Sequence, residues 1–327
     1  MKGVLIRDSR WRLKLIRKDI KYFWNFSRYL ITRKAQSEPL IRIDTEALRP
    51  DYSRPLCLFC SFDKESVIRE SVYWYLKELL LAGFNIIFIS TSDTISDVDL
   101  EKLSQCCIRI INRENKGYDF YGWKTALEKY PQYQLHKSLL LANDSVIGPL
   151  FSMRDLLPKL ESYDADIIGM TDCFHFHPHL QSYFIYCKKK VVTSKEFALF
   201  FQRVDILDLK IAIIRKYEVG FSRFLGRRFR IAALYDVREV VNRVNYHQKP
   251  VRWINPTFHL WKTLITDFKF PFLKRNLLTD NVTNKQEVLE TLRTHTSYNV
   301  DLLVNWLTQH SNEHEAQTAS QPGFSDK

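Results

Sequence analysis

The sequence predicts an α/β fold, in which a mostly parallel sheet carries helices on both faces and is followed by a helical C-terminal part. Short apolar runs typical of buried strands alternate with segments whose apolar residues recur at helical spacing. Each apolar run ends in polar residues before the next helical segment begins. Alternation of this kind is typical of parallel sheets that are covered on both faces.

Four strands and three helices make up the first half of the expected sheet. The strands are expected at residues 56–62, 85–89, 107–111 and 138–142. The helices between them are expected at residues 66–82, 97–104 and 120–130. Gly83 closes the first helix and Pro131 follows the last. Because ligands bind outside the carboxyl ends of parallel strands, the polar residues after these strands are expected to share one edge of the sheet.

Further helices and strands are expected beyond Pro149. The helices are expected at residues 152–160 and 197–203, and the strands at residues 166–170 and 180–187. A Thr193-x-x-Glu196 capping box opens the second of these helices. Residues 205–246 are expected to be mainly helical, with a break at the segment YEVGFS.

This pattern divides the chain into four parts. Residues 1–54 form a basic aromatic helix and a linker, residues 55–190 the α/β core, and residues 191–308 a mainly helical part. Residues 309–327 lack apolar periodicity and are expected to be disordered.

The N-terminal helix has two interpretations. Trp11, Leu15, Tyr22, Phe26 and Tyr29 lie near helical spacing among many lysines and arginines. Such a helix either lies in an anionic membrane interface, with its rings at the headgroups, or packs on the body of the protein. A polar linker follows it at residues 36–55.

The composition predicts an intracellular protein with an acidic partner. The 327 residues are 45% hydrophobic, and their net charge of +12 suits nucleic acid, a phosphorylated ligand or an anionic membrane. Cys57 and Cys60 form a CxxC within a strand pattern, which favours buried thiols in a reducing cytoplasm. No apolar run approaches the roughly 20 residues of a membrane span, and no secretory signal is visible. The glycine-rich motifs of dinucleotide sites and P-loops are missing too.

Asp144 is the leading candidate for a metal ligand. It follows a buried strand and is flanked by Asn143 and Ser145. Magnesium takes oxygen ligands and often has only one or two carboxylates beside substrate phosphates. Asp144 would then hold a divalent cation that neutralises a departing diphosphate. The alternative is that Asn143 and Asp144 form a turn and cap the next helix.

Polar residues after two other strands are candidates for ligand contact. They are Ser61, Asp63, Asn115, Lys116, Gly117 and Asp119. A turn at Asn115-Lys116-Gly117, with Arg113, would approach a phosphate or nucleobase through its backbone amides. Asp119 would face the ligand or cap the following helix, and Asp63 has the same two interpretations.

A later group suits sugar hydroxyls and acid–base chemistry. His179, Gln181 and Ser182 would hydrogen-bond a sugar, and this is favoured over a zinc site of three alternating histidines, which Pro178 interrupts. Glu218 lies between two expected helices. It is a candidate general base, a role that contributes about 10²- to 10⁴-fold in rate, or else a solvated glutamate at a helix end.

Several long motifs carry a family resemblance. In chain order they are NRENKGYDFYGWKTAL, LLLANDSVIGPL, DIIGMTDCFHFHPHLQSYFIY, YEVGFS, and NPTFHLWKTLI followed by FPFLKRNLL. Together they resemble the rhamnan synthesis protein F family, bacterial glycosyltransferases of cell-wall and lipopolysaccharide (O-antigen) polysaccharide assembly. The likeness covers roughly residues 55–280.

The resemblance implies a glycosyltransferase A type fold, in which the central strand of a nucleotide-binding sheet ends in an acidic metal motif. Asn143-Asp144-Ser145 stands where that fold usually carries Asp-x-Asp. Asp144 is then the implied main ligand of a divalent cation, Mg²⁺ or Mn²⁺. His259 would complete the metal shell, or else serve as a core histidine.

The resemblance also implies the two substrates. The donor would be a nucleoside diphosphate sugar, with dTDP-rhamnose as the expected one, bound by residues 55–190. The acceptor would be a lipid-linked or growing cell-surface glycan at the inner face of the bacterial membrane, on the side of residues 191–308. Such an acceptor suits the basic N-terminal helix and an anionic membrane surface.

Direct displacement with inversion is the expected mechanism. Glu218 would deprotonate the acceptor hydroxyl, while Asp144, its metal and nearby cations stabilise the leaving diphosphate. One alternative is a nucleotide-sugar-binding scaffold without catalysis, suggested by the asparagine at position 143. A basic nucleic-acid-binding protein is a third hypothesis, but the chain has no RNA-binding or helix-turn-helix motif, so no nucleic-acid partner is expected.

Overall fold

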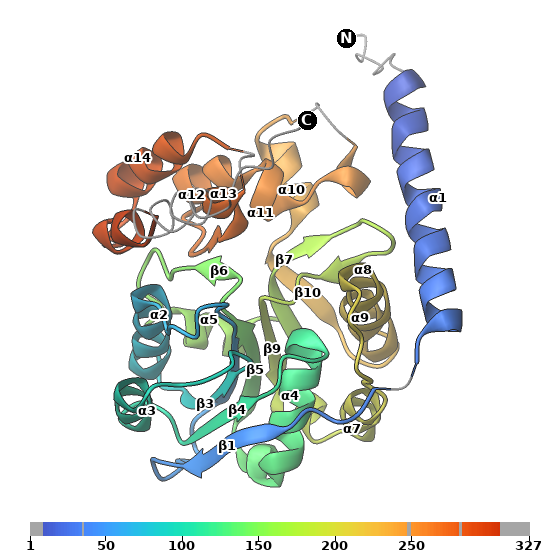
Figure 1. Ribbon diagram of the computed structural model, residues 1–327. Coiled ribbons are helices and arrows are strands. Elements are labelled where there is room, and N and C mark those ends of the chain that lie inside the picture. The colour runs from blue at the N-terminus through green and yellow to red at the C-terminus, as the bar shows by residue number, and fades with distance from the viewer. Residues whose placement is uncertain (1–8, 35, 247–249, 281–282, 308–327) are drawn as a thin grey trace, which may run out of the picture.

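Apolar strands form the centre of the molecule. The computed structural model describes residues 9–34, 36–246, 250–280 and 283–307. The main sheet has the strand order β1-β4-β3-β2-β5-β9-β7-β10, with β8 paired to β7 (Figure 1). Its strands are β1 (Ile41–Glu46), β2 (Leu56–Ser61), β3 (Asn85–Ser90), β4 (Arg109–Arg113), β5 (Ser138–Asn143), β7 (Ile167–Cys173), β8 (His179–Leu180), β9 (Phe184–Lys188) and β10 (Ile231–Tyr235). The strands β4, β3, β2 and β5 run parallel, as do β7 and β10, whereas β1, β8 and β9 are antiparallel to their neighbours. The predicted α/β fold with a mostly parallel sheet is confirmed.

Helices cover both faces of the sheet because alternate strand residues are apolar on both sides. Leu56 and Leu58 of β2 pack into one hydrophobic core, and Cys57 and Phe59 into the other. The helices are α4 (Tyr118–Lys129), α7 (Lys195–Gln202) and α9 (Val219–Leu225) on the first face, and α2 (Glu70–Leu81), α3 (Asp97–Ser104) and α5 (Leu156–Ser162) on the second. Full burial of a leucine side chain stabilises the fold by roughly 1.5–3 kcal/mol, so these two cores fix the central strands in place.

The C-terminal helices gather beyond the carboxyl end of the central strand (Figure 1). They are α10 (Val237–Arg243), α11 (Pro256–His259), α12 (Trp261–Phe268), α13 (Asn276–Thr279) and α14 (Lys285–His295). The two-residue strand β6 (Val146–Ile147) follows β5 and pairs antiparallel with β11 (Leu273–Lys274). This pairing brings the C-terminal segment to the end of β5.

Short helices complete the chain. They are η1 (Pro131–Leu135), α6 (Lys189–Val192), α8 (Lys210–Ile213), the π-helical turn η2 (Ile214–Glu218) and η3 (Val251–Trp253). All six cysteines are free, and all but Cys106 are buried, as their apolar surroundings predict.

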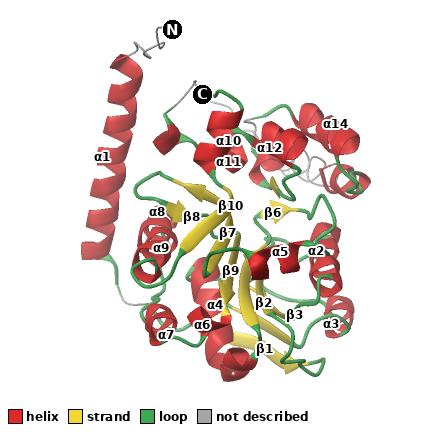
Figure 2. Cartoon of the chain, turned by 180° about the vertical axis from the view of Figure 1, so that it is seen from behind, coloured by secondary structure: helices red, strands yellow, loops and turns green. Residues whose placement is uncertain are grey.

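The N-terminal helix α1 (Ser9–Thr32) lies beside α8 and α9 (Figures 1 and 2). One of its sides is fixed to the body of the protein. The Tyr29 hydroxyl accepts the Asp208 N–H at 3.1 Å, and Arg33 pairs with Asp205 at 3.2 Å. The packing interpretation therefore holds for this side of the helix. Within the described ranges, no helix combines the length and the apolar character that crossing a membrane requires.

Two strands of the main sheet were missed because they lie at its edges, and the two-residue strands β6 and β11 were missed too. β1 pairs with β4 inside the predicted linker, and β10 pairs with β7 inside the range predicted as mainly helical. Most residues of both strands are partly or fully exposed, so neither has the apolar run that marks a central strand. Residues 55–190 and 191–308 therefore contribute to one sheet.

Several element boundaries differ from the prediction; for example, α5 begins at Leu156 and not at residue 152, and β4 spans Arg109–Arg113 and not residues 107–111. The strand expected at residues 180–187 is divided into β8 and β9, and the helix expected from residue 66 begins at Glu70. Ser194, not Thr193, caps α7 by accepting the Phe197 N–H at 3.2 Å. The tail expected at residues 309–327 lies outside the described residues.

Candidate active site

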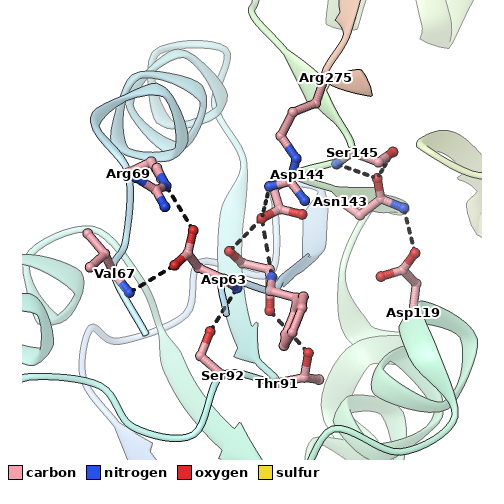
Figure 3. A network of polar contacts seen from close by, with 12 residues as sticks. Asp63, Val67, Arg69, Thr91, Ser92, Asp119, Asn143, Asp144, Ser145 and Arg275 are labelled. Carbon is pink, nitrogen blue, oxygen red and sulfur yellow. Dashed lines mark hydrogen bonds and ion pairs between the residues drawn. The ribbon is translucent and has the colours of Figure 1, made fainter. Parts of the chain in front are cut away.

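Asp144 lies at the carboxyl end of the central strand β5, where several groups donate hydrogen bonds to one of its oxygens (Figure 3). Its Oδ2 accepts the Ser61 hydroxyl at 3.0 Å and the Phe62 N–H at 3.2 Å. Arg275 Nη1 lies 3.2 Å from the same oxygen and forms an ion pair with it. Ser61 ends β2, the parallel neighbour of β5, so the two strand ends meet as the strand order predicts.

Lys274 and Arg275 were missed as site residues; Lys274 ends β11, and Arg275 follows it at the start of α13. Lys274 Nζ donates to Ser145 Oγ at 2.9 Å and lies 5.4 Å from the centre of the Tyr183 ring. Burial lowers the pKa of Lys274 to about 8, although the charges of Glu218 and Asp119 act to raise it. The basic segment FKFPFLKRN was the available signal, but its place depends on the pairing of β11 with β6.

Asn143 uses both ends of its amide inside the site. Its Nδ2 donates to Asp119 Oδ2 at 2.9 Å, and its Oδ1 accepts the Ser145 N–H at 3.1 Å and the Ser145 hydroxyl at 2.6 Å (Figure 3). Burial raises the pKa of Asp119 to about 6, and the Asp144 charge contributes to the increase. Asp119 and Asp144 thus belong to one polar cluster, together with the amide of Asn143.

Neither carboxylate of this cluster caps a helix. The N-cap of α4 is Gly117, and Asp119 lies in the first turn of the helix. Strand β6, not a helix, follows Asp144. The capping interpretations of these two residues are wrong, because the side chains face the end of the sheet.

The loop before α4 is shaped from within by Arg113. This buried side chain donates to three carbonyl oxygens of the loop at 2.6 to 3.0 Å, so it is not directed at a ligand as expected. Gly117 has a φ of +79°, and a Cβ there would lie 2.7 Å from the Tyr121 Cβ. Lys116 pairs with the neighbouring glutamate at 2.8 Å, and Asn115 is exposed.

Asp63 organises the loop after β2 (Figure 3). Its Oδ2 pairs with Arg69 Nε at 2.8 Å, and its Oδ1 accepts two N–H groups of its own loop at 2.9 and 3.4 Å. Its own N–H donates to Ser92 Oγ at 3.0 Å, at the end of β3. Asp63 does not start the next helix, because α2 begins at Glu70.

A cleft of about 350 Å³, which we call the Asp144 cleft, opens beside these residues. Its walls come from the end of β2, from α2, from β6 and from the C-terminal segment. They include Phe62, Asp63, Arg69, Tyr75, Asp144 and Arg275. Ligand pockets for small molecules have volumes of roughly 300–1,000 Å³, so this cleft can hold a nucleoside.

A second cleft, which we call the Glu218 cleft, also measures about 350 Å³. Its walls include Tyr22, His179, Gln181, Lys210, Glu218 and Asn255. The Ser182 N–H donates to Glu218 Oε1 at 2.8 Å, and Gln181 Nε2 donates to Asn255 Oδ1 at 3.2 Å. The predicted sugar-binding residues and the predicted base therefore meet here. Asn255 was missed, although it belongs to one of the long motifs.

The residues of the site do not fit a metal ion held by the protein. Asp144 Oδ2 is engaged by three donors, one of them a guanidinium, and the Asn143 Oδ1 accepts from Ser145. His259 lines neither cleft, and its Nδ1 accepts the Asn255 N–H at 2.9 Å within the turn of α11. In the part of the chain that the structure describes, no three His, Cys, Asp or Glu side chains are grouped to hold a metal.

The three alternating histidines are not grouped on one face. Phe176 has a φ of +69° and turns the chain between His175 and His177, which is exposed. His179 alone is buried, with its Nδ1 2.7 Å from the His177 carbonyl oxygen.

Comparison with known sequences identifies a family and two relatives. The profile of Rhamnan synthesis protein F matches residues 86–320. An uncharacterised protein, y4gN of Sinorhizobium fredii, is 30% identical over 178 residues, which are 53% of this chain and 46% of that protein. The virulence protein VirA of Vibrio anguillarum is 27% identical over 269 residues, 73% of this chain and 84% of that protein. The chain thus spans less than half the length of the first relative.

Solved structures of similar shape are also found. The glycosyltransferase GlyE of Streptococcus pneumoniae TIGR4 has a TM-score of 0.41 and 10% identity, with 84% of this chain and 67% of that chain covered. The mannosyltransferase PcManGT of Pyrobaculum calidifontis, in complex with GDP-Man and Mn²⁺, has a TM-score of 0.37 and 8% identity, with 92% and 90% covered.

Proposed function

The chain belongs to the rhamnan synthesis protein F family, a glycosyltransferase-like family, and on this premise we propose that it transfers a sugar from a nucleoside diphosphate donor to a glycan. One observation carries the proposal: at the end of the central strand, the cluster of Asp119, Asn143 and Asp144 borders a nucleoside-sized cleft, and Lys274 beside it is close enough to Glu218 to respond to its charge. The resemblance to the glycosyltransferase A type fold implies such an acidic end of the central strand, and β5 carries it.

The donor would bind across the ends of β2 and β5. Its nucleoside would occupy the Asp144 cleft, where the exposed Phe62 ring gives a surface for stacking a base. Its sugar would point toward Glu218. Rhamnose is the expected sugar because the family is that of rhamnan synthesis, and dTDP-rhamnose is the first donor to try.

Transfer would be a direct displacement with inversion. Glu218 takes the proton of the acceptor hydroxyl, whose oxygen forms a bond to the anomeric carbon. The bond from that carbon to the diphosphate oxygen breaks, and its electron pair leaves with the diphosphate. The bond from the Ser182 N–H holds one oxygen of Glu218 and fixes its orientation.

The acceptor would enter the Glu218 cleft. Its polar walls, Lys210, Asn255, Gln181 and His179, offer donors and acceptors for sugar hydroxyls. Tyr22 of α1 closes one side of this cleft, with its ring 6.3 Å from that of Phe176. The N-terminal helix therefore borders the place where the acceptor would bind.

A membrane-bound acceptor is supported by the free side of α1. Ile16, Ile20, Phe23, Trp24 and Ile31 share one face of the helix, and 52% to 83% of each residue's surface is exposed. Exposed Arg17, Lys21 and Arg28 lie beside this apolar face. An apolar strip bordered by cations suits an anionic lipid surface, so α1 would hold the Glu218 cleft at the membrane that carries the glycan.

Nucleotide binding is the direct test of the donor site. We would titrate the protein with dTDP, UDP and GDP in a calorimeter, beside the Asp144→Ala variant. Selective binding of one nucleotide that the variant weakens would support the proposal. If the folded wild-type protein bound none of the three, the donor site would be refuted.

A scaffold that binds the donor without catalysis is a second candidate, favoured by the asparagine at position 143. Donor binding without release of the nucleoside diphosphate, even with membrane extracts as acceptor, would support this candidate. Turnover that depends on Glu218 would exclude it.

A further inference from the structure

Two cations, Lys274 and Arg275, lie beside the end of β5 in the candidate site. Arg275 pairs with Asp144, and the neighbouring Lys274 donates to the Ser145 hydroxyl. Within the described residues, no carboxylate oxygen lies within the 4.0 Å of an ion pair to Lys274 Nζ. A partly buried ammonium without a counter-ion is costly unless an anion joins it.

The two consecutive side chains contact different residues at the end of β5: Lys274 contacts Ser145, and Arg275 contacts Asp144. Arg275 lines the Asp144 cleft. Lys274 lies over the Tyr183 ring and is close enough to Glu218 and Asp119 to feel their charges. One cation therefore faces the cleft proposed for the donor, and the other is near the carboxylates of Glu218 and Asp119.

We propose that Lys274 and Arg275 bind the diphosphate of the donor and neutralise it as it leaves, the task that a divalent cation performs at strand ends with two carboxylates. This inference rests on the proposed transfer reaction. The guanidinium can donate two hydrogen bonds in one plane to phosphate oxygens, and the ammonium acts as a point charge. The asparagine at position 143 is consistent with this proposal, because charge neutralisation by Lys274 and Arg275 requires no second acidic metal ligand.

The electron balance of the step needs no further reactant. When the anomeric carbon–oxygen bond breaks, the pair of electrons goes to the diphosphate oxygen. The two cations stabilise the negative charge that develops there, and the proton of the acceptor hydroxyl goes to Glu218.

The test compares nucleoside diphosphates with monophosphates in the presence of EDTA. We would titrate the wild-type protein, Lys274→Met and Lys274→Arg with dTDP, UDP, GDP and their monophosphates. Lys262→Met is the matched control, because this exposed lysine pairs with Glu287 on the far helices α12 and α14. Circular dichroism checks that each variant folds.

We expect the wild-type protein to bind one diphosphate in EDTA and to prefer it over the monophosphate. Lys274→Met should weaken binding of the diphosphate about tenfold or more, as expected for a lost charged hydrogen bond, and should weaken binding of the monophosphate less. Lys274→Arg should restore most of the preference, and Lys262→Met should change nothing.

Two results would separate the possible failures. Binding that requires added Mg²⁺ or Mn²⁺ and is equal in wild type and Lys274→Met would overturn the role of the two cations and leave the transferase proposal standing. A wild-type protein that binds no nucleotide with or without metal would overturn the donor site itself, and this inference with it.

Discussion

Glu218 accepts the backbone N–H of Ser182 at 2.8 Å, a bond that ties the end of a π-helical turn to the segment between β8 and β9. Isolated π-helical turns occur frequently at functional sites, because they redirect a side chain within a helix. Here the redirected side chain lines a cleft with His179, Gln181 and Asn255. The base and the sugar-binding residues thus form one unit, although they come from different parts of the chain.

Replacing Glu218 with glutamine tests the general base. The amide oxygen of Gln can still accept the Ser182 N–H, so the fold should be retained, but the group can no longer take a proton. Release of nucleoside diphosphate with membrane extract as acceptor should fall by about 10²- to 10⁴-fold, with donor binding unchanged. The exposed Glu128 gives the control Glu128→Gln, which should be fully active. Full activity of Glu218→Gln would reject the assignment.

The pH dependence of donor binding follows from Lys274. Burial lowers its pKa to about 8, so the ammonium is present at pH 7 and is lost as the pH rises through that value. A bound diphosphate favours the charged form, so affinity should decrease from pH 7 to pH 9. Calorimetric titrations at several pH values would measure this.

Lys274→Arg supplies the control for this pH profile. A guanidinium keeps its charge throughout the range, so the variant should show a much flatter profile than wild type. Phosphate groups lose their last proton near pH 6, below the range measured. A wild-type affinity that stays constant up to pH 9 would mean that the Lys274 charge does not contribute to binding.

The central strands could be predicted from the sequence because both of their faces are buried. β2, β3 and β5 appear at the expected positions within one residue at their ends, and α3 appears with its expected bounds. Their order along the chain was enough to bring Ser61 and Asp144 to one edge of the sheet. The end of a buried strand can be recognised in the sequence, because it is the point at which an apolar run gives way to polar residues.

Lys274, Arg275 and Asn255 could not be predicted as site residues. Lys274 ends a two-residue strand, and Arg275 and Asn255 precede short helices, so all three reach the site only through tertiary contacts such as the pairing of β11 with β6. Arg113 was predicted to contact a ligand because its sequence neighbours are polar. In the structure its guanidinium donates its hydrogen bonds to three backbone carbonyl oxygens instead. Composition marks a loop as polar and does not say which side chains face inward.

Gly122 in α4 should be sensitive to substitution because the helix packs closely on the sheet. A Cβ at this position would lie 2.7 Å from Cys60 Sγ on β2. Gly122→Ala should therefore destabilise the protein by about 1–3 kcal/mol despite the better helix propensity of alanine. Urea unfolding would measure the change.

Gly220 in α9 gives the opposite expectation and serves as the matched control. The nearest atom to a Cβ there is the Arg215 carbonyl oxygen, 4.0 Å away. Gly220→Ala should be neutral or stabilise the protein by up to about 1 kcal/mol. Equal effects of the two substitutions would contradict the close approach of α4 to β2.

The free face of α1 makes the membrane proposal testable without knowledge of the acceptor. The protein should sediment with vesicles of phosphatidylcholine and phosphatidylglycerol, and less with phosphatidylcholine alone, because each lysine or arginine near an anionic surface adds about 1 kcal/mol. Trp24→Glu places a charge in the apolar face and should weaken binding at least tenfold. Added salt should weaken the binding of the wild-type protein, since the cations of this face are exposed.

Asn25→Glu is the matched control, because this exposed neighbour of Trp24 lies on the polar side of α1 and receives the same charge. The control should lose much less binding than Trp24→Glu, since it adds the charge without removing apolar contact. Equal losses in both variants would mean that net charge alone governs the association. The wild-type protein could instead fail to bind vesicles and form a dimer that Trp24→Glu converts to a monomer. This result would show that a second copy of the chain covers the apolar face of α1, and that the membrane does not position the Glu218 cleft.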